Sequence, residues 1–273
     1  MHCCGSMQSS TPSYGSLDVF ISLFVWIQRD KGVGEYMCLK VKNLIFSYIK
    51  GKNVLAGADF EAEKGKVSAI LGVNGAGKTT LLNILAGIYT SYGGEVFVDG
   101  ELISKKNVMK IKRKFFFIGD EPILFEEMTA LQFIKYIHAI YKKNLDYGRL
   151  TQLSQKFQFE KYLCIDCGKL SLGNRQKALI ITALLLQCEI LILDEPLVGL
   201  DVMAIEIFYD EIRSYAGDGR IVIFSTHIIE VVSNACDNVF VLDKGRIRDS
   251  FEVTDEIDIK SKFFEVLNYA GDI

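Results

Sequence analysis

A glycine-rich segment that ends in lysine and threonine carries the most specific chemistry in the sequence. Residues 72–80 read GVNGAGKTT and fit the pattern G-x-x-x-x-G-K-[ST]. The apolar run Val67–Leu71 before it predicts a strand, and the residues from Lys78 to Ala86 predict a helix. Glycines let backbone N–H groups curl around phosphate oxygens, and a helix N-terminus adds partial positive charge. The segment therefore predicts a nucleoside triphosphate site rather than an ordinary glycine-rich turn.

Each residue type in this segment has an expected task. Lys78 is a point charge that we expect to be exposed and to reach the β- and γ-phosphates, as a ligand and as a catalytic residue. We expect the hydroxyl of Thr79 to bind Mg²⁺. The expected nucleotide-binding residues of the segment are Gly72, Asn74, Gly75, Ala76, Gly77, Lys78, Thr79 and Thr80.

A second aliphatic run, Ile190–Leu193, ends in two carboxylates, Asp194 and Glu195. This pattern is typical of a buried strand that delivers acidic groups to a cleft at its carboxyl end. Asp194 fits a Mg²⁺ ligand, and Glu195 fits a base that polarises the attacking water. An Asp-Glu pair after a strand is more often a solvated turn. Beside a phosphate-binding loop, we favour the catalytic interpretation.

These loops need a framework that brings the ends of several strands together. Apolar runs predict strands at Lys40–Phe46, Val67–Leu71, Val96–Val98, Phe115–Ile118, Ile190–Leu193, Ile221–Phe224 and Val239–Leu242. Helical spacing predicts helices at Lys78–Ala86, Ala130–Lys143, Asn174–Gln187 and Val202–Tyr215. Asp99-Gly100 predicts a hairpin turn, and Thr129 is placed to cap a helix. Alternating strands and helices imply an α/β fold with a mostly parallel sheet. Residues 120–188, with little strand character, predict an inserted helical subdomain.

The two ends of the chain differ from this pattern. Residues 1–36 are rich in Ser and Gly and then contain the apolar run Val19–Ile27. They predict a poorly ordered extension. An interfacial anchor is the alternative, but the run lacks the basic polar face of such helices. We expect the nucleotide-binding domain to span residues 37–250 and a C-terminal helical tail to span 251–273.

Composition excludes several classes of protein. Of 273 residues, 49% are hydrophobic and 24% are charged, which excludes a mainly disordered chain. The net charge of −3 makes a broad basic surface for nucleic acid improbable, so we expect no nucleic-acid partner. No run approaches the roughly twenty apolar residues of a membrane-spanning helix. Seven cysteines, an odd number, favour reduced thiols; for Cys164 and Cys167 we favour structural thiols over a zinc site, which needs four ligands.

Four further elements, in order along the chain, resemble those of the ABC-transporter ATPases. Residues 170–176 read LSLGNRQ, similar to the family signature Leu-Ser-Gly-Gly-Gln. Gly199-Leu200-Asp201 resembles the family's D-loop, and His227 matches its switch histidine. Tyr48 lies where the family places an aromatic ring that stacks on adenine. With the phosphate loop and Asp194-Glu195, the resemblance extends from about Met37 to Ile247.

The resemblance implies a P-loop NTPase (RecA-like) core, an N-terminal antiparallel β subdomain and an active site shared by two subunits. Two ATPase domains pair head to tail, and Ser171 and Gly173 of one would meet the γ-phosphate bound by the other. These donors would supply electrostatic stabilisation of phosphoryl transfer. His227 would be catalytic and Tyr48 would bind adenine. The alternatives are a structural histidine and a core or edge-strand aromatic.

Two departures from the family pattern matter. Leu172 and Asn174 stand where the signature has glycine and glutamine. If that glycine position requires a positive φ, we expect Leu172 to be strained there. The glutamine that couples the γ-phosphate to the permease is replaced by Asp120, with Glu121 as the other candidate. We expect the carboxylate of Asp120 to approach Mg²⁺ or the attacking water, although an ionised carboxylate donates no hydrogen bond.

The expected function is that of an ATP-binding, ATP-hydrolysing subunit that works with Mg²⁺. It would act as a homo- or heterodimer, at the cytoplasmic face of a membrane, and drive a separate transmembrane permease. The sequence around Asp120 resembles export-type members. A soluble ATPase of translation or DNA repair is one alternative, although such relatives generally carry two cassettes, a coiled coil or zinc modules. A regulatory cassette that binds ATP without hydrolysis is the other.

Overall fold

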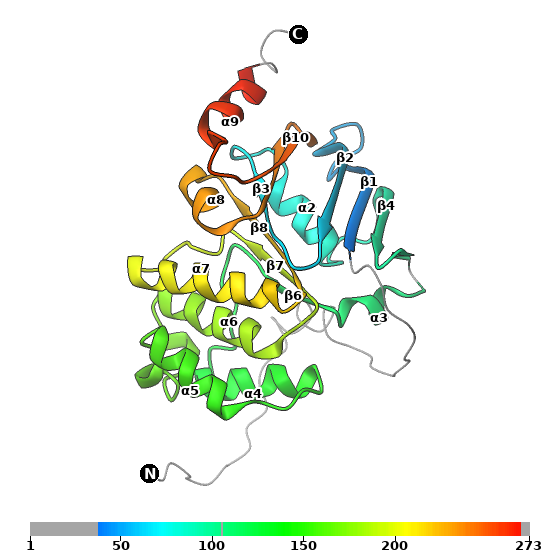
Figure 1. Cartoon of the computed structure of the whole chain (residues 1–273). Helices are drawn as coiled ribbons and strands as arrows, with labels where there is room; N and C mark the ends of the chain where they lie inside the picture. Colours follow the sequence, from blue (N-terminus) through cyan, green and yellow to red (C-terminus); the bar gives the residue numbers. More distant parts are fainter. Residues whose placement is uncertain (1–37, 105, 269–273) are drawn as a thin grey trace.

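The computed structural model describes residues 38–104 and 106–268, and the predicted extension over residues 1–36 lies outside them (Figure 1). A six-stranded sheet forms the centre of the molecule, in the order β10-β9-β3-β8-β7-β6. Its neighbouring strands run parallel except for the antiparallel pair β9–β10. The strands are β3 (Val67–Leu71), β6 (Phe115–Ile118), β7 (Ile190–Asp194), β8 (Ile221–Thr226), β9 (Asn238–Asp243) and β10 (Arg246–Glu252).

A smaller antiparallel sheet lies beside this centre, in the order β2-β1-β4-β5. Its strands are β1 (Cys38–Phe46), β2 (Leu55–Glu63), β4 (Gly93–Val98) and β5 (Glu101–Leu102). The predicted hairpin turn at Asp99-Gly100 joins β4 to β5, with φ angles of 54° and 74°. Such positive φ values at both central residues are typical of a two-residue hairpin turn. The two sheets confirm the predicted α/β fold with an antiparallel β subdomain.

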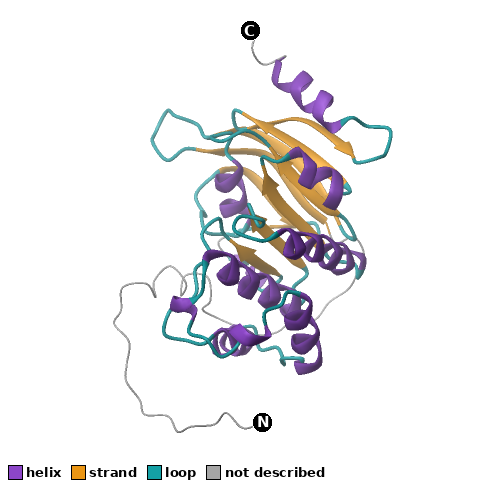
Figure 2. Cartoon of the chain, turned by 90° about the vertical axis from the view of Figure 1, so that its left-hand side faces the viewer, coloured by secondary structure: helices purple, strands orange, loops and turns teal. Residues whose placement is uncertain are grey.

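Helices cover both faces of the six-stranded sheet (Figure 2). They are α2 (Lys78–Leu85), α3 (Val108–Lys112), α4 (Ala130–Ile140), α5 (Tyr147–Lys156), α6 (Leu172–Leu186), α7 (Val202–Gly217), α8 (Ile229–Ala235) and α9 (Ile259–Asn268), with 3-10 turns η1 (Glu160–Tyr162) and η2 (Cys167–Lys169). Between β6 and β7 the chain forms α4, α5 and α6, where we predicted a helical insertion. Thr129 caps α4, as predicted, in a reciprocal pair of hydrogen bonds with Gln132.

The central strands are buried on both faces because parallel strands pack between helices. Successive side chains alternate between two apolar clusters. In β7, Leu191 and Leu193 face the cluster with α4, α6 and α7, whereas Ile190 and Ile192 face the cluster with α2 and the antiparallel sheet. Burial of both sheet faces fixes the strand register, because a slip by one residue would exchange the side chains that face the two apolar clusters. The carboxyl ends of β3, β7 and β8 therefore meet at one edge.

The structure adds two strands to the prediction and corrects the bounds of two helical segments. Strands β2 and β10 were not predicted from the sequence. The predicted tail over 251–273 is not helical throughout, because β10 continues to Glu252 and α9 begins only at Ile259. Helix α6 begins at Leu172 rather than Asn174, because Ser171 caps it.

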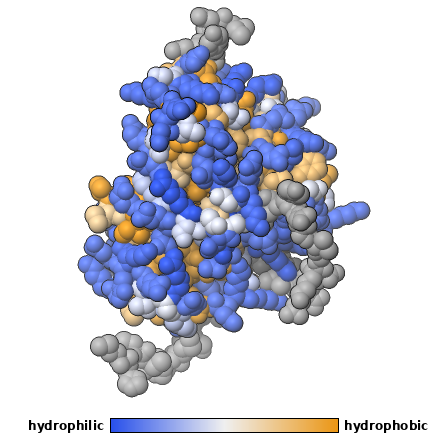
Figure 3. Space-filling model, viewed as in Figure 1, coloured by the Kyte–Doolittle hydropathy of each residue, from blue (hydrophilic) through white to orange (hydrophobic). Residues whose placement is uncertain are grey.

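No helix among the described residues is long and apolar enough to cross a membrane. On the face seen in Figure 3, apolar residues form small patches between hydrophilic ones.

Candidate nucleotide-binding and catalytic site

The predicted phosphate loop joins β3 to α2 and lies against the end of β9. A Cβ atom on Gly72 would come within 2.4 Å of the Leu242 carbonyl oxygen, so only glycine fits there. Gly77, at the N-cap of α2, has a φ of 109°, which favours glycine. No side chain caps this helix. Its first N–H groups are thus available to an anion such as a phosphate.

Lys78 is buried, which corrects the expectation of an exposed side chain. Only 7% of it is accessible, and its Nζ donates to the carbonyl oxygens of Gly72 (2.9 Å) and Val73 (3.3 Å). The same Nζ lies 3.6 Å from Oε1 of Glu195. The ammonium folds back into the loop because a buried cation needs acceptors. It is held where the loop would enclose phosphate oxygens.

Glu195 connects Lys78 to His227. His227 Nδ1 donates to Glu195 Oε1 over 2.8 Å, since a carboxylate can only accept. The backbone of Glu195 has a φ of 47°, a strained conformation for a residue with a side chain. Its N–H donates to Ser225 Oγ over 2.9 Å, which helps to hold this conformation. Lysine, glutamate and histidine thus form one contact chain, as a catalytic base with an orienting partner requires.

Asp194 has the environment of a metal ligand. Its side chain is buried, Oδ1 accepts from the Ser225 hydroxyl, and Oδ2 has no hydrogen-bond partner among the described residues. Burial raises the pKa of this carboxyl, while the neighbouring hydroxyls of Ser225 and Thr79 lower it. The negative charges of Asp120 and Glu195 raise that pKa further. An unpaired buried carboxylate oxygen near the hydroxyl of the exposed Thr79 fits Mg²⁺, which prefers oxygen ligands.

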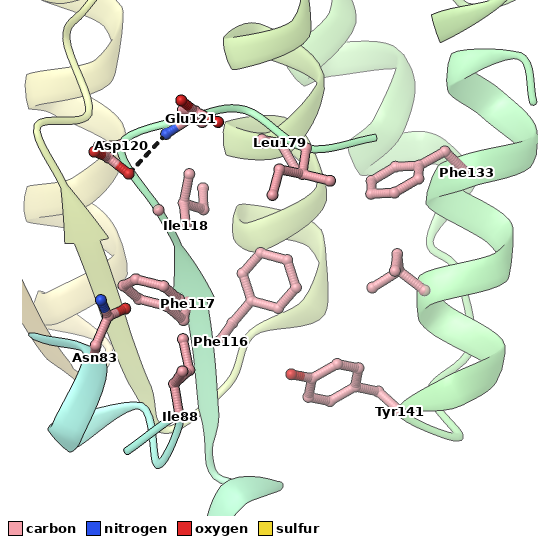
Figure 4. A pocket seen from close by; sticks show the side chains of 13 residues that line it. Asn83, Ile88, Phe116, Phe117, Ile118, Asp120, Glu121, Phe133, Tyr141 and Leu179 are labelled. Atoms are coloured by element: carbon pink, nitrogen blue, oxygen red, sulfur yellow. Dashed lines mark hydrogen bonds between the residues drawn. The ribbon is translucent and has the colours of Figure 1, made fainter. Parts of the chain in front are cut away.

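Asp120 and Glu121 follow β6 at the end of an apolar cleft of about 220 Å³ (Figure 4). Asp120 Oδ1 accepts from the Glu121 N–H over 3.0 Å, and both side chains are exposed. The cleft below them lies between β6 and the helices α4 and α6, and its walls include Phe116, Phe133 and Tyr141. Asp120 therefore lines the apolar cleft, and its negative charge also acts on the carboxyl of Asp194.

Tyr48 lies at the rim of the phosphate loop. Its ring is 56% exposed, and its hydroxyl is 3.0 Å from Thr80 Oγ1. Phe46 and Tyr89 pack edge-on against it, with ring centroids 5.0 and 5.8 Å away. The exposure argues against the alternative of a core aromatic. These contacts hold the ring beside α2 with surface left for a ligand.

Ser171 and Gly173 lie at the N-terminus of α6. Ser171 is exposed and caps the helix by accepting from the Asn174 N–H over 3.4 Å. A Cβ atom on Gly173 would lie 2.1 Å from the carbonyl oxygen of Gly199, so the helix rests directly on the D-loop. Among the described residues, no hydrogen bond joins Ser171 or Gly173 to residues 72–80.

The expectation of a strained Leu172 is wrong. Leu172 is the first helical residue of α6 and has no positive φ. Its side chain is 51% exposed and lies over Gly199, within 3.1 Å of where a Cβ atom would be. This backbone accepts leucine because the first turn of a helix needs no left-handed residue.

Sequence reasoning missed Ser225, which bonds both to Asp194 and to the backbone of Glu195. The polar pair after Ile221–Phe224, directly before His227, was the available signal.

The C-x-x-C pair holds free thiols: Cys164 is exposed, and burial raises the pKa of Cys167 to about 11. Within the described residues, no group of three or more His, Cys, Asp or Glu side chains is arranged to hold a metal ion. The zinc interpretation gains no support from the structure.

Fold and site together define a P-loop nucleoside triphosphatase. The chain belongs to the ABC transporter family, whose model matches residues 55–198. It is similar to two ABC transporter ATP-binding proteins of Bacillus subtilis (strain 168). AlbC is 37% identical over 85% of this chain and 98% of its own length. NatA is 35% identical over 68% of this chain and 76% of its own length.

Solved structures agree. An ATP-binding subunit of an ABC transporter, 26% identical, superposes with a TM-score of 0.74 over 86% of this chain and 99% of its own. CbiO1 of Clostridium perfringens, part of the transporter complex CbiONQ, is 28% identical. It superposes with a TM-score of 0.68 over 86% of this chain and 96% of its own. The dimeric cassette MJ0796, 23% identical, shares the fold, with a TM-score of 0.71 over 79% of this chain and 99% of its own. The chain is thus an ATP-binding, ATP-hydrolysing subunit that energises an ABC transporter.

Proposed function

We propose that the chain hydrolyses ATP at a site completed by a second ATPase subunit, and that dimer closure drives a separate membrane permease. The observation that supports this proposal is the separation of two half-sites. Lys78, Glu195 and His227 contact one another within the chain. Ser171, by contrast, is exposed at the start of α6 and has no hydrogen bond to the phosphate loop among the described residues.

Within one half-site, each side chain has a distinct task. Residues 72–80 enclose the phosphates with backbone N–H groups, and Lys78 binds the β- and γ-phosphates. Glu195 polarises the attacking water, and His227 orients Glu195 through its Nδ1–H. The exposed face of Tyr48 stacks on adenine.

Thr79, Asp194 and Asp120 would hold Mg²⁺, which when bound neutralises charge on the phosphates. The unpaired Oδ2 of Asp194 supports this set of ligands. Ser171 and Gly173 of the partner subunit would then donate to the γ-phosphate and favour the charge that develops during transfer. The shared site makes hydrolysis depend on subunit association.

The permease engages the ATPase next to Asp120. The apolar cleft of about 220 Å³ ends at this residue, so a segment bound there would lie against both the helical insertion and a Mg²⁺ ligand. The proposal puts the subunit at the cytoplasmic face of the membrane, bound to its permease. The likeness to export-type members stays a prediction.

Mixing two inactive variants tests the shared site. Lys78→Ala inactivates the phosphate loop and keeps Ser171, whereas Ser171→Arg blocks the donor surface and keeps Lys78. Neither alone should hydrolyse ATP, but a mixed dimer contains one intact site and should regain activity. Lys78→Ala mixed with the double variant Lys78→Ala/Ser171→Arg is the matched control, because no intact site can form. A mixture as inactive as this control would contradict the proposal.

A further inference from the structure

A buried carboxylate on α7 binds two cations on α5. The side chain of Glu211 is only 3% exposed. Its Oε1 accepts from Lys156 Nζ over 2.6 Å, and its Oε2 accepts from Arg149 Nη2. Both oxygens are therefore satisfied, which a buried carboxylate requires. We call these three residues, Glu211, Arg149 and Lys156, the Glu211 clamp.

The clamp closes around α6. Helix α6 packs against α5 and against α7, and it lies between them in Figure 1. Residues Gln176–Leu186 of α6 are buried in this arrangement. Because Glu211 reaches from α7 to α5, it joins the two helices that flank α6. The clamp therefore limits how far α6 can tilt away from the rest of the molecule.

A second ion pair ties α7 to α6 near the proposed donor surface. Lys177 Nζ donates to Asp201 Oδ2 over 2.6 Å, and Asp201 also caps α7 by accepting from the Ala204 N–H. Glu211 lies ten residues after Asp201, about 15 Å farther along the helix at 1.5 Å per residue. The Lys177–Asp201 pair attaches α6 to the start of α7, and the clamp joins the helices that flank α6 farther along, so α6 is restricted at two places along α7.

We infer that Glu211 is a positioning residue for ATP hydrolysis. The clamp holds α6 between α5 and α7 and so aims Ser171 and Gly173 at the nucleotide of the opposite subunit. This inference rests on the shared site proposed above. Glu211 itself lies on α7, away from the phosphate loop, so it acts through α6 and does not touch the phosphates.

The test combines Glu211→Gln with Glu195→Gln, which slows hydrolysis and preserves the ATP-bound state. Glutamine keeps the shape of Glu211 and removes the charge that binds Arg149 and Lys156. ATP affinity of the monomer should stay within about twofold, because the phosphate loop is untouched. ATP-driven dimerisation should need about tenfold more protein, a typical effect for coupled contacts. Glu206→Gln, an exposed change on the same helix, is the matched control and should shift neither quantity.

Arg149→Gln removes one of the two cations and serves if Glu211→Gln folds poorly. It should shift dimerisation in the same direction, and the double variant Arg149→Gln/Glu211→Gln should be no worse than Glu211→Gln alone. Hydrogen exchange of the monomer is the second readout. Amides of α5 and of the first turns of α6 should exchange faster in Glu211→Gln, while those of α2 should not change.

The outcomes separate this inference from the proposed function. If Glu195→Gln alone stays monomeric with ATP, the shared site fails, and hydrogen exchange still decides whether the clamp restrains α6. If Glu195→Gln dimerises and Glu211→Gln lowers only the melting temperature, with the dimerisation midpoint unchanged, Glu211 is merely structural and the inference is overturned. Unchanged exchange in α5 and α6 would overturn it as well.

Discussion

The phosphate loop and the N-terminus of α6 differ in how their polar groups are buried and hydrogen-bonded. At the phosphate loop, Lys78 is 7% exposed and lies within 3.6 Å of Glu195, which in turn bonds to His227. At the start of α6, Ser171 is exposed, and among the described residues its hydroxyl bonds to the first turn of its own helix alone.

This difference shows which half of the site is complete within one chain. Buried charges persist only with partners, so the groups around Lys78 must be arranged by the fold itself. An exposed N-cap hydroxyl needs no such partner and can be offered to another molecule. In the proposed site, one chain therefore supplies a complete binding half-site and, on a separate surface, donors for the half-site of a second subunit.

Replacing Lys78 should break the complete half-site and have the largest effect. We expect Lys78→Ala to lower hydrolysis by about 10³-fold or more, because it removes the main point charge on the phosphates. Since Lys78 is buried against Glu195, the melting temperature should also fall. Lys52→Ala, which changes an exposed lysine, is the control. Near-normal ATPase activity of purified Lys78→Ala would rule out the role given to the phosphate loop.

Ser171→Ala should break the other half. We expect turnover to fall by about 10²-fold with unchanged ATP affinity of the monomer, as when one transition-state donor is removed. The change also removes a helix cap, at about 1 kcal/mol of stability. Thr129→Ala removes the cap of α4 in the same way and is the matched control for turnover. Equal losses in the two variants would reduce Ser171 to a structural cap.

Substitutions of Tyr48 test the rim of the phosphate-loop half-site, where we expect adenine to stack. Tyr48→Ala should weaken ATP binding by about 1–3 kcal/mol, the range for base–aromatic stacking. Tyr48→Phe keeps the ring and loses the hydroxyl contacts with Thr80 and Tyr89, so its affinity should change little. Titration with a fluorescent ATP analogue measures both. Equal losses in the two variants would assign the effect to the hydroxyl.

Leu172→Gly should have the smallest effect. Because Leu172 has an unstrained helical backbone, restoring the family's glycine relieves nothing and should not raise turnover. We expect a loss of stability below about 1 kcal/mol from the flexibility of glycine. Steady-state ATPase assays and thermal melts check this. A several-fold rise in turnover would mean that the leucine side chain crowds the partner's nucleotide.

Local sequence determined how much could be predicted. The strands beside the phosphate loop and Glu195 are short aliphatic runs with motif residues directly after them, so strand and site were predicted together. Strand β2 contains glycine, alanine and acidic residues, and it forms because β1 supplies its hydrogen-bond partners. The burial of Lys78 depends on a contact with Glu195, which is distant in sequence. The helical backbone of Leu172 follows from the cap at Ser171, which the family pattern does not indicate.

The dimerisation of Glu195→Gln tests the account most directly. The substitution keeps the size of the side chain and removes the charge that polarises the attacking water, while Lys78, Thr79 and Asp194 can still bind ATP and Mg²⁺. A ligand bound between two subunits shifts association by mass action. Size-exclusion chromatography with light scattering should show a monomer without nucleotide or with ADP, and a dimer with ATP and Mg²⁺. If the natural partner is a different cassette, the dimer should appear on mixing the two. A monomer under every condition, even with partner cassette and permease present, would contradict the shared site.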